Sequence, residues 1–345
     1  MTMRAEHRRA AAGLLALASL LLVAGCGVPD PFASSGLGGK AITLDMPIVN
    51  GSHPFLIAHV RVAGGPSIPV LVDTGSPGLR VFANRVGKAG LTTDGEREST
   101  TYEDGTIFTG SRANAPVSIG NLPTAGPIAI QLVEQVSCSP QSPHCAGSDG
   151  LPTFARQQGF AGILGIGLMK APVYSPLVQL EGGPARSFGI QINPSQTSAR
   201  LAFNVSPTAP TGAYPLPPSQ DGPLPNGLPA WDSNSAAACW SFGTAAPACA
   251  PTSFDTGSPR VLASTRIPGA PGEGSAPGGT RLTMFTSSGA NPVWSLSAGT
   301  TPGRDQMVVG KINAGNAVNT GLPLFTSRSV TFDIAGGQVL VSDPG

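Results

Sequence analysis

The sequence predicts an all-β protein built from two similar lobes, and three observations lead to this fold class. Short apolar or alternating runs recur along most of the chain and are separated by turn residues. The 345 residues include 46 glycines and 35 prolines, and long stretches with helical periodicity are scarce. The pentapeptide Asp-Thr-Gly-Ser-Pro occurs twice, starting at Asp73 and at Asp255. We therefore expect two β-rich lobes that each present one copy of this loop.

The first 26 residues have the pattern of an export signal. Three arginines within the first nine residues precede an apolar stretch, residues 10–23, that is too short to span a bilayer comfortably. The stretch ends in Val-Ala-Gly-Cys, which resembles the lipobox of bacterial lipoproteins, in which Cys26 becomes the lipid-modified first residue. We interpret residues 1–26 as a lipoprotein signal peptide; an ordinary secretory signal with a chance cysteine is the alternative. An aspartate directly after the lipid-modified cysteine resembles an inner-membrane retention signal. Position 27 is a glycine instead, so we expect an outer-membrane anchor, on the periplasmic face or the cell surface.

Four cysteines remain after the signal, and they predict two disulfides. An even number of cysteines in an exported chain favours disulfides in an oxidising compartment. Proximity along the sequence favours the pairs Cys138/Cys145 and Cys239/Cys249, although four cysteines permit three connectivities. Metal binding is the weaker alternative, because the chain contains no CxxC or HExxH pattern. We expect no metal and no cofactor.

The part of the chain after the signal divides by composition into four segments. Residues 27–40 are small, polar and rich in glycine and proline, which predicts a flexible tether. Residues 41–205 contain closely spaced strand-like runs and are interpreted as the N-terminal β lobe. Residues 206–235 are so rich in proline that they cannot carry a central strand, and we interpret them as the connection between the lobes. Residues 236–345 then form the C-terminal β lobe with the second Asp-Thr-Gly loop.

Individual elements follow from local patterns. Strand-like runs in the first part of the chain cover residues 42–49, 55–62, 68–73, 79–82, 106–110, 115–120 and 128–136. One helical turn is expected where Ser175 provides an N-cap, Pro176 occupies the first helical position and two glycines end the turn. Charged residues make up only 11% of the chain and the net charge is +1, so no basic face for nucleic acid is expected.

The repeated aspartate permits a specific chemistry if the two loops meet. Each copy follows strand-forming residues and precedes renewed apolar residues, so a duplicated unit explains the repeat better than coincidence. Two carboxyl groups held close together cannot both ionise cheaply, and they share one proton. The ionised partner can then take a proton from water while its protonated neighbour polarises a carbonyl group. Two ordinary Asx-type turns at strand ends are the alternative.

Together these features resemble the pepsin-like aspartic peptidases. The resemblance implies a bilobal acid-protease fold, with two β-barrel-like lobes, a cleft between them, and Asp73 and Asp255 as the catalytic dyad. Further stretches that carry the resemblance are FAGILGIG (160–167), TTYEDGTIFTG (100–110), SFGIQINPSQTSARLAFN (187–204) and GLPLFTSRSVTFDIAGGQVLV (321–341). An even closer similarity is to an uncharacterised bacterial lipoprotein family that carries DTGS-x-GLR, ILG-x-G and GLP-F in this order.

The neighbours of each aspartate are expected to fix the acids in place. Gly75 and Gly257 should let backbone amides approach each carboxylate. Thr74 and Thr256 should form hydrogen bonds across the lobe boundary. The hydroxyls of Ser76 and Ser258 should donate to an outer oxygen of each carboxylate. FAGILGIG (160–167) is similar to the family's hydrophobic-hydrophobic-Gly segment, in which a strand passes beside the first aspartate loop. The corresponding segment of the second lobe is matched best by the polar Asn-Thr-Gly at 319–321.

The segment 100–110 resembles the family's flap hairpin, which covers the cleft. Tyr102 stands at the position of the flap tyrosine and Gly105 lies in the turn, and both are predicted to contact substrate; an exposed aromatic in an ordinary hairpin is the alternative. Arg80 stands where the family commonly has a tryptophan. Its guanidinium is expected either to donate to the Tyr102 hydroxyl or to a backbone carbonyl beside the cleft, or to face the solvent.

The leading functional hypothesis is an aspartic endopeptidase in which a water molecule is activated between Asp73 and Asp255. Its partner is an extended peptide or protein laid along the β-rich cleft, and we expect a monomer held by its lipid anchor. The alternative is a catalytically silent envelope lipoprotein that binds peptides or a partner protein. A purely structural lipoprotein would leave the double motif unexplained, and a serine hydrolase is disfavoured because no GxSxG motif occurs.

Overall fold

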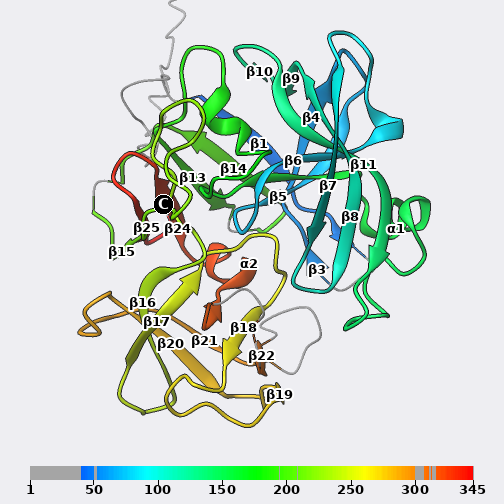
Figure 1. Ribbon diagram of the computed structural model, residues 1–345. Helices are drawn as coiled ribbons and strands as arrows, with labels where there is room; N and C mark the ends of the chain where they lie inside the picture. The colour runs from blue at the N-terminus through cyan, green and yellow to red at the C-terminus, as the bar shows by residue number, and fades with distance from the viewer. Residues whose placement is uncertain are drawn as a thin grey trace, which may run out of the picture. The chain divides into compact units, whose positions relative to one another are not determined.

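Strand pairing divides the protein between two large sheets (Figure 1). The computed structural model describes residues 40–49, 53–193, 195–207, 209–299, 307–310, 312 and 316–344, all within the unit Pro31–Gly345. The predicted signal peptide, Cys26 and residues 27–39 of the predicted tether lie outside the described residues. Among the described residues, no helix combines the length and the apolar character needed to cross a membrane.

The larger sheet has fifteen strands and begins where the sequence predicts folding to begin, at Ala41. In chain order its strands are β1 (Ala41–Asp45), β4 (Ile57–Val62), β5 (Ile68–Asp73), β6 (Pro77–Phe82), β7 (Thr92–Thr101), β8 (Thr106–Ala115), β9 (Val117–Ile119), β10 (Leu122–Pro123), β11 (Ile128–Cys138), β12 (Gly162–Ile166), β13 (Ser187–Ile192), β14 (Ser198–Phe203), β15 (Gly212–Pro215), β24 (Ser329–Asp333) and β25 (Gln338–Ser342). A separate ribbon pairs β2 (Ile48–Val49) with β3 (His53–Pro54).

The second sheet has eight strands and forms the lower part of Figure 1. Its strands are β16 (Ala236–Phe242), β17 (Ala248–Ser253), β18 (Val261–Ser264), β19 (Gly274–Ser275), β20 (Arg281–Phe285), β21 (Pro292–Ser297), β22 (Met307–Gly310) and β23 (Val318–Asn319). The indole of Trp240 is fully buried in this sheet's core and meets Trp294 edge to face, with ring centroids 6.3 Å apart. These side chains belong to one continuous apolar cluster that also contains the buried residues of the larger sheet.

Both sheets contain the same three-strand unit. In the first sheet β12 runs between β5, to which it is parallel, and β6, to which it is antiparallel. In the second sheet β23 runs between β17 and β18 with the same two directions. A Cβ added at Gly165 of β12 would lie 2.6 Å from the carbonyl oxygen of Ser76, so only glycine fits this close crossing. The duplicated unit predicted from the repeated pentapeptide is therefore confirmed.

The structure differs from the sequence prediction in where the lobes divide. Strands β24 and β25 belong to residues 236–345, yet β24 pairs with β13 and so extends the larger sheet (Figure 1). The rings of Phe188 and Phe332 stack across this pairing with centroids 4.8 Å apart. The connection predicted over residues 206–235 also contributes β15, which lies at the edge of the sheet, where a strand that contains proline is tolerated. Sheet membership therefore does not follow the chain division at residue 236.

Helical structure is sparse in the described part of the chain, and only one of its four elements was predicted. The elements are η1 (Ala83–Arg85), α1 (Leu151–Gln158), η2 (Pro176–Gln179) and α2 (Gly321–Phe325). The helical turn expected after Ser175 is found as the 3-10 turn η2, and the Ser175 hydroxyl accepts from the Leu177 amide at 3.4 Å. The unpredicted α1 buries only Phe154 and ends at Gly159 in a left-handed conformation. Eight residues with one buried side chain leave too short a periodic pattern to detect.

Two disulfides join the predicted cysteine pairs, Cys138 with Cys145 and Cys239 with Cys249. The first closes a loop that follows β11, and the second joins residues that lie opposite one another in β16 and β17. The pairing chosen from sequence proximity is therefore confirmed.

Candidate active site

The two Asp-Thr-Gly-Ser segments form equivalent loops. The first aspartate loop, residues 73–76, connects β5 to β6, and the second aspartate loop, residues 255–258, connects β17 to β18. Asp73 is the last residue of β5 and is 5% exposed, whereas Asp255 follows β17 and is partly buried. Each carboxyl group is thus delivered by a strand of a different sheet.

Thr74 and Thr256 join the two loops by reciprocal hydrogen bonds. The Thr256 amide donates to Oγ1 of Thr74 at 2.9 Å, and that hydroxyl donates to the carbonyl of Phe254 at 2.6 Å. In the mirror arrangement the Thr74 amide donates to Oγ1 of Thr256 at 3.2 Å, and this hydroxyl donates to the carbonyl of Val72 at 2.7 Å. Both side chains are essentially inaccessible to solvent. The structure thus makes the predicted contact between the lobes, and it fixes the separation of the two acids.

Glycines allow each carboxyl group to pack against the opposite loop. The Gly75 amide donates to Oδ1 of Asp73 at 2.8 Å, and the Gly257 amide donates to Oδ1 of Asp255 at 2.7 Å. A Cβ added at Gly75 would lie 2.6 Å from Cγ of Asp255, and one added at Gly257 would lie 2.7 Å from Oδ1 of Asp73. The two carboxyl groups therefore meet across the loop boundary, at a separation that no larger residue permits.

The surroundings of Asp255 favour its protonated form. Burial raises the pKa of Asp255 well above its ordinary value, and the negative charge of Asp73 and a hydrogen bond with Asp73 raise it further. Hydrogen bonds from Asn319 and from the Gly257 amide oppose this rise in pKa without cancelling it. Asp255 therefore keeps its proton at pH values where an exposed aspartate is ionised.

The outer oxygens of the two aspartates have different partners. The Ser76 hydroxyl donates to Oδ2 of Asp73 at 2.5 Å, as predicted. The matching prediction for Ser258 is wrong, because its hydroxyl donates to the carbonyl of Arg260 at 2.8 Å. The side-chain amide of Asn319 instead donates to Oδ2 of Asp255 at 2.7 Å. Asn319 is the first residue of the polar Asn-Thr-Gly match. This contact was not predicted, but an asparagine where the family has an apolar residue is the signal that could have indicated it.

The flap, defined as β7, β8 and their turn at residues 102–105, lies beside the dyad. Tyr102 begins the turn: its amide donates to the Thr106 carbonyl at 2.8 Å, and its ring meets Phe108 edge to face at 5.2 Å. Its hydroxyl is buried with no partner among the described residues, and burial raises its pKa. Gly105 faces the first disulfide loop, since a Cβ added there would lie 2.3 Å from Cβ of Ser142.

Arg80 contacts both the flap strand β7 and the strand that follows the first aspartate loop. The side chain is only 7% exposed, so the predicted alternative of a solvent-facing residue is wrong. Its guanidinium donates to the carbonyls of Pro77 and Gly78 and to Oγ1 of Thr100 in β7. The predicted backbone-carbonyl contact is therefore found, whereas the bond to the Tyr102 hydroxyl is not. These hydrogen bonds connect β7 of the flap to the start of β6, directly after the first aspartate loop.

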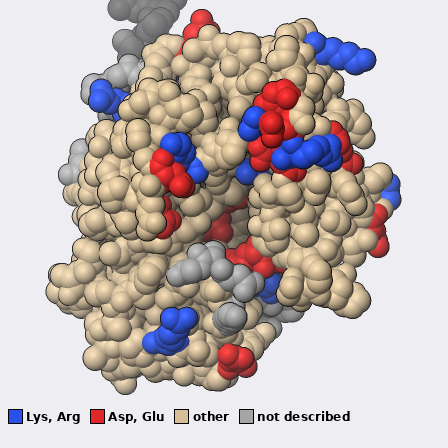
Figure 2. All heavy atoms as spheres, in the orientation of Figure 1, with Lys and Arg blue, Asp and Glu red and all other residues tan. Residues whose placement is uncertain are grey.

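Sequence reasoning missed two further residues of the site. Asn234, from the connection between the lobes, donates to the carbonyl of Gly75 at 3.2 Å and accepts from the hydroxyl of Ser253 at 2.8 Å. Glu103 in the flap turn accepts from the amide of Asn319 at 3.2 Å. Asn234 lies in no recognised motif, and Glu103 lies in the flap-like segment but was not singled out there, because its partner Asn319 is 216 residues away along the chain. Figure 2 shows acidic side chains inside the central hollow of the face it displays.

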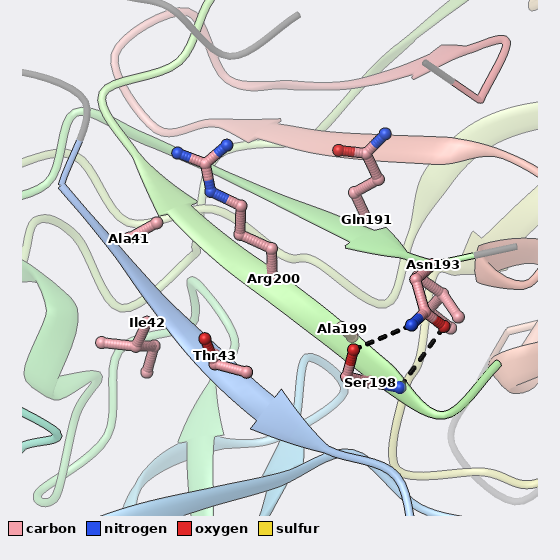
Figure 3. Close-up of a pocket in the computed structure, with 9 residues that line it drawn as sticks. Ala41, Ile42, Thr43, Gln191, Asn193, Ser198, Ala199 and Arg200 are labelled. Atoms are coloured by element: carbon pink, nitrogen blue, oxygen red, sulfur yellow. Dashed lines mark hydrogen bonds between the residues drawn. The ribbon is translucent and has the colours of Figure 1, made fainter. Parts of the chain in front are cut away.

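A second hollow lacks comparable chemistry. It measures about 570 Å³ and lies over β1, β13 and β14, and Figure 3 shows Arg200 and Gln191 among its lining side chains. The side chain of Asn193 donates to the hydroxyl of Ser198 at 2.9 Å, a bond that links the two strands at their turn. No carboxylate lines this hollow. Within the described residues, no three His, Cys, Asp or Glu side chains are grouped so that they could hold a metal ion.

Known proteins share both the sequence pattern and the fold. The sequence model of a family described as "PE-PGRS C-terminal aspartyl peptidase-like domain" matches residues 42–338. PE cleavage protein A of Mycobacterium tuberculosis, from strains CDC 1551 / Oshkosh and ATCC 25618 / H37Rv, is 30% identical over 112 residues, which make up 30% of this chain and 19% of that protein. The similarity therefore spans less than a fifth of these relatives. The crystal structure of aspartic proteinase from Irpex lacteus matches with a TM-score of 0.56 at 15% identity, covering 89% of this chain and 98% of the other. The predicted bilobal pepsin-like fold is confirmed.

Proposed function

The chain belongs to the family of PE-PGRS C-terminal aspartyl peptidase-like domains, and on this premise we propose that it is an aspartic endopeptidase. It hydrolyses peptide bonds with a water molecule activated between Asp73 and Asp255. The observation that carries the proposal is the exchange of hydrogen bonds between Thr74 and Thr256, which brings the two carboxyl groups together. An Asx turn needs no such partner 182 residues away.

The geometry supports a division of roles within the pair. Asp255 keeps a proton because it is buried beside the charge of Asp73. It therefore acts as the acid that polarises the carbonyl of the scissile bond, while Asp73 accepts a proton from the attacking water. In the second half of the reaction Asp73 gives its proton to the leaving amine as the C–N bond breaks, Asp255 regains a proton from a hydroxyl of the tetrahedral diol, and no covalent intermediate with the protein forms. The fixed amides of Gly75 and Gly257 hold both carboxyl groups in place throughout.

The proposed substrate is an extended segment of a peptide or protein. The flap offers the backbone of an antiparallel hairpin beside the dyad, and an extended chain can form hydrogen bonds with such an edge. The name of the mycobacterial relative describes cleavage, which agrees with a proteolytic role. We propose that the protein acts as a monomer.

The proposed place of action is the outer membrane, where lipid on Cys26 would anchor the protein. The proposal rests on the early arginines, the short apolar stretch and the lipobox-like Val-Ala-Gly-Cys. The two disulfides agree with an oxidising compartment. Labelling of the expressed protein with a radioactive fatty acid tests this anchor: label should be incorporated into the wild type and not into the Cys26→Ala variant.

Proteolysis of casein by the purified protein tests the enzymatic proposal. We expect cleavage that a statine-type inhibitor blocks, and a loss of at least about 1,000-fold in Asp73→Asn and in Asp255→Asn, because each acid carries one half of the proton transfer. Asp149→Asn is the matched control, since this aspartate is exposed and lies outside the site. Circular dichroism verifies that every variant is folded. Intact casein across acidic to neutral pH, with a folded wild type, would favour the silent peptide-binding protein instead.

A further inference from the structure

The two aspartates are supported by residues of unequal kind. Ser76 lies in the first aspartate loop, three residues after the acid to which it donates. Its counterpart Ser258 donates to a backbone carbonyl and leaves Oδ2 of Asp255 to Asn319, which lies 64 residues further along the chain. The second acid therefore depends on a separate strand for its position.

The orientation of the Asn319 amide group is fixed on both sides. Its Oδ1 accepts from the amide of Gly321 at 2.9 Å, so the nitrogen must point towards Asp255. The side chain is 2% exposed, and the backbone of Asn319 lies in register with Ser253 of β17 and Leu262 of β18. A buried side chain with a fixed donor is suited to holding a carboxylate oxygen in one place.

The same nitrogen also reaches the flap. Its second hydrogen is donated to Oε2 of Glu103 at 3.2 Å, whereas Oε1 of Glu103 is buried and has no partner among the described residues. The other charged groups near Glu103 are Arg260 and Asp104, and burial raises the pKa of the Glu103 carboxyl. One amide group thus bridges a carboxyl group of the flap and a carboxyl group of the dyad.

We propose that Asn319 is a positioning residue that does for Asp255 what Ser76 does for Asp73, and that it holds the flap over the dyad through Glu103. This inference rests on the proposed peptidase function. Removal of the amide donor withdraws a hydrogen bond that favours the ionised form of Asp255. The proton of Asp255 is then held more tightly, and its carboxyl group is free to turn away from the reacting water.

Substitution Asn319→Leu keeps the branching of the side chain at Cγ and removes the donor. We expect kcat to fall by about tenfold to a hundredfold, because the acid loses its fixed position. The basic limb of the pH profile of kcat/KM should move up by about one pH unit, since that limb reports loss of the acid's proton. Asn319→Ala also lacks the donor, so it should shift the limb in the same direction, and it serves if the leucine variant does not fold. Asn291→Leu, at an exposed asparagine near β21, is the control and should leave both readouts unchanged.

The flap contact has its own pair of variants. Glu103→Gln retains an oxygen that can accept from Asn319 and should keep KM within about twofold of the wild type. Glu103→Leu removes the acceptor and should raise KM about five- to tenfold with a smaller change in kcat, because the flap no longer closes against the second lobe. Equal KM values for these two variants would overturn the role of Glu103.

A change in thermal stability alone would contradict the positioning role. If Asn319→Leu lowers Tm but leaves kcat and the basic limb of the profile as in the wild type, Asn319 is only structural. A wild type that cleaves nothing would instead refute the proposed function. The positioning role is then decided by NMR titration of the 13C-labelled Asp255 carboxyl group in the full-length protein, and equal pKa values in wild type and Asn319→Leu would overturn it.

Discussion

The two aspartate loops share five letters of sequence and form the same inner structure. In each loop the glycine amide donates to Oδ1 of the aspartate, at 2.8 Å in the first and 2.7 Å in the second. The two threonines exchange equivalent bonds with the opposite loop. The contacts that each aspartate loop makes with the other loop are therefore determined by the repeated motif itself.

The outer structure of the two loops differs, although the letters are the same. Asp73 is held from within its own loop by Ser76, whereas Asp255 is held from outside by Asn319. Seven residues after each acid stand Arg80 and Leu262, which occupy equivalent places beside β12 and β23. The comparison teaches that a repeated motif determines the contacts between the two repeats, while the surrounding residues determine which group supports the outer oxygen of each acid.

Among changes outside the two acids themselves, the largest effect is expected where the equivalent contacts of the two loops are broken. Gly75→Ala and Gly257→Ala each place a Cβ within 2.7 Å of the opposite carboxyl group, so the two acids must move apart. A displacement near 1 Å is enough to lower activity by about 100-fold or more. Casein cleavage by folded variants measures this loss. Gly126→Ala and Gly272→Ala are controls, because an added Cβ there meets nothing within 4 Å; a similar loss in these controls would contradict the steric argument.

Replacement of Arg80 by leucine makes the first unit resemble the second. Arg80→Leu removes donors to Thr100 and to two carbonyls of the strand that follows the loop, and it leaves these buried or partly buried acceptors without this partner. We expect the free energy of unfolding to fall by about 2 kcal/mol and KM to rise, because the flap strand loses its link to the loop. Urea denaturation measures the stability, with Arg156→Leu on the surface of α1 as the control. An unchanged free energy of unfolding in Arg80→Leu would mean that Arg80 contributes no more to stability than the exposed Arg156.

Fold and site differ in how far sequence could predict them. The duplicated unit, the flap and the disulfide pairs rely on short-range patterns, and the structure contains all of them. Ser258 was assigned by analogy with Ser76, but the rotamer of a serine depends on which acceptor lies nearer, and here this is the carbonyl of Arg260. Asn234 meets Gly75, and Glu103 meets Asn319, across more than 150 residues of chain, a relation that no local pattern contains.

The raised pKa of Asp255 predicts a pH dependence of stability. Below the ordinary aspartate pKa of 3.8, Asp255 is protonated in both folded and unfolded states and makes no difference. As the pH rises above that value, the unfolded chain releases this proton first, so the stability of the fold decreases until the raised pKa of Asp255 is passed. Each unit between the two pKa values costs about 1.4 kcal/mol.

Asp255→Asn removes this cost because the amide does not ionise. We expect the variant to unfold at a higher temperature than the wild type at neutral pH and to show a flatter decline of Tm from acidic to neutral pH. Glu103, whose pKa is also raised by burial, adds a remaining slope of the same sign. Tm curves of wild type and variant that run parallel across the pH range would show that Asp255 is not the group responsible.

The smallest effect is expected at Ser258, and its size tests the asymmetry directly. Ser258→Ala removes one bond to a carbonyl at a partly exposed position, so stability should change by no more than about 0.5 kcal/mol and kcat by less than about twofold. Ser76→Ala removes the donor to Oδ2 of Asp73 and should lower kcat by about tenfold, as a misplaced acid requires. Equal losses of kcat in the two variants would mean that Ser258 turns back to Asp255 during the reaction. The second acid would then be supported by its own loop, as the first one is, and Asn319 would be dispensable.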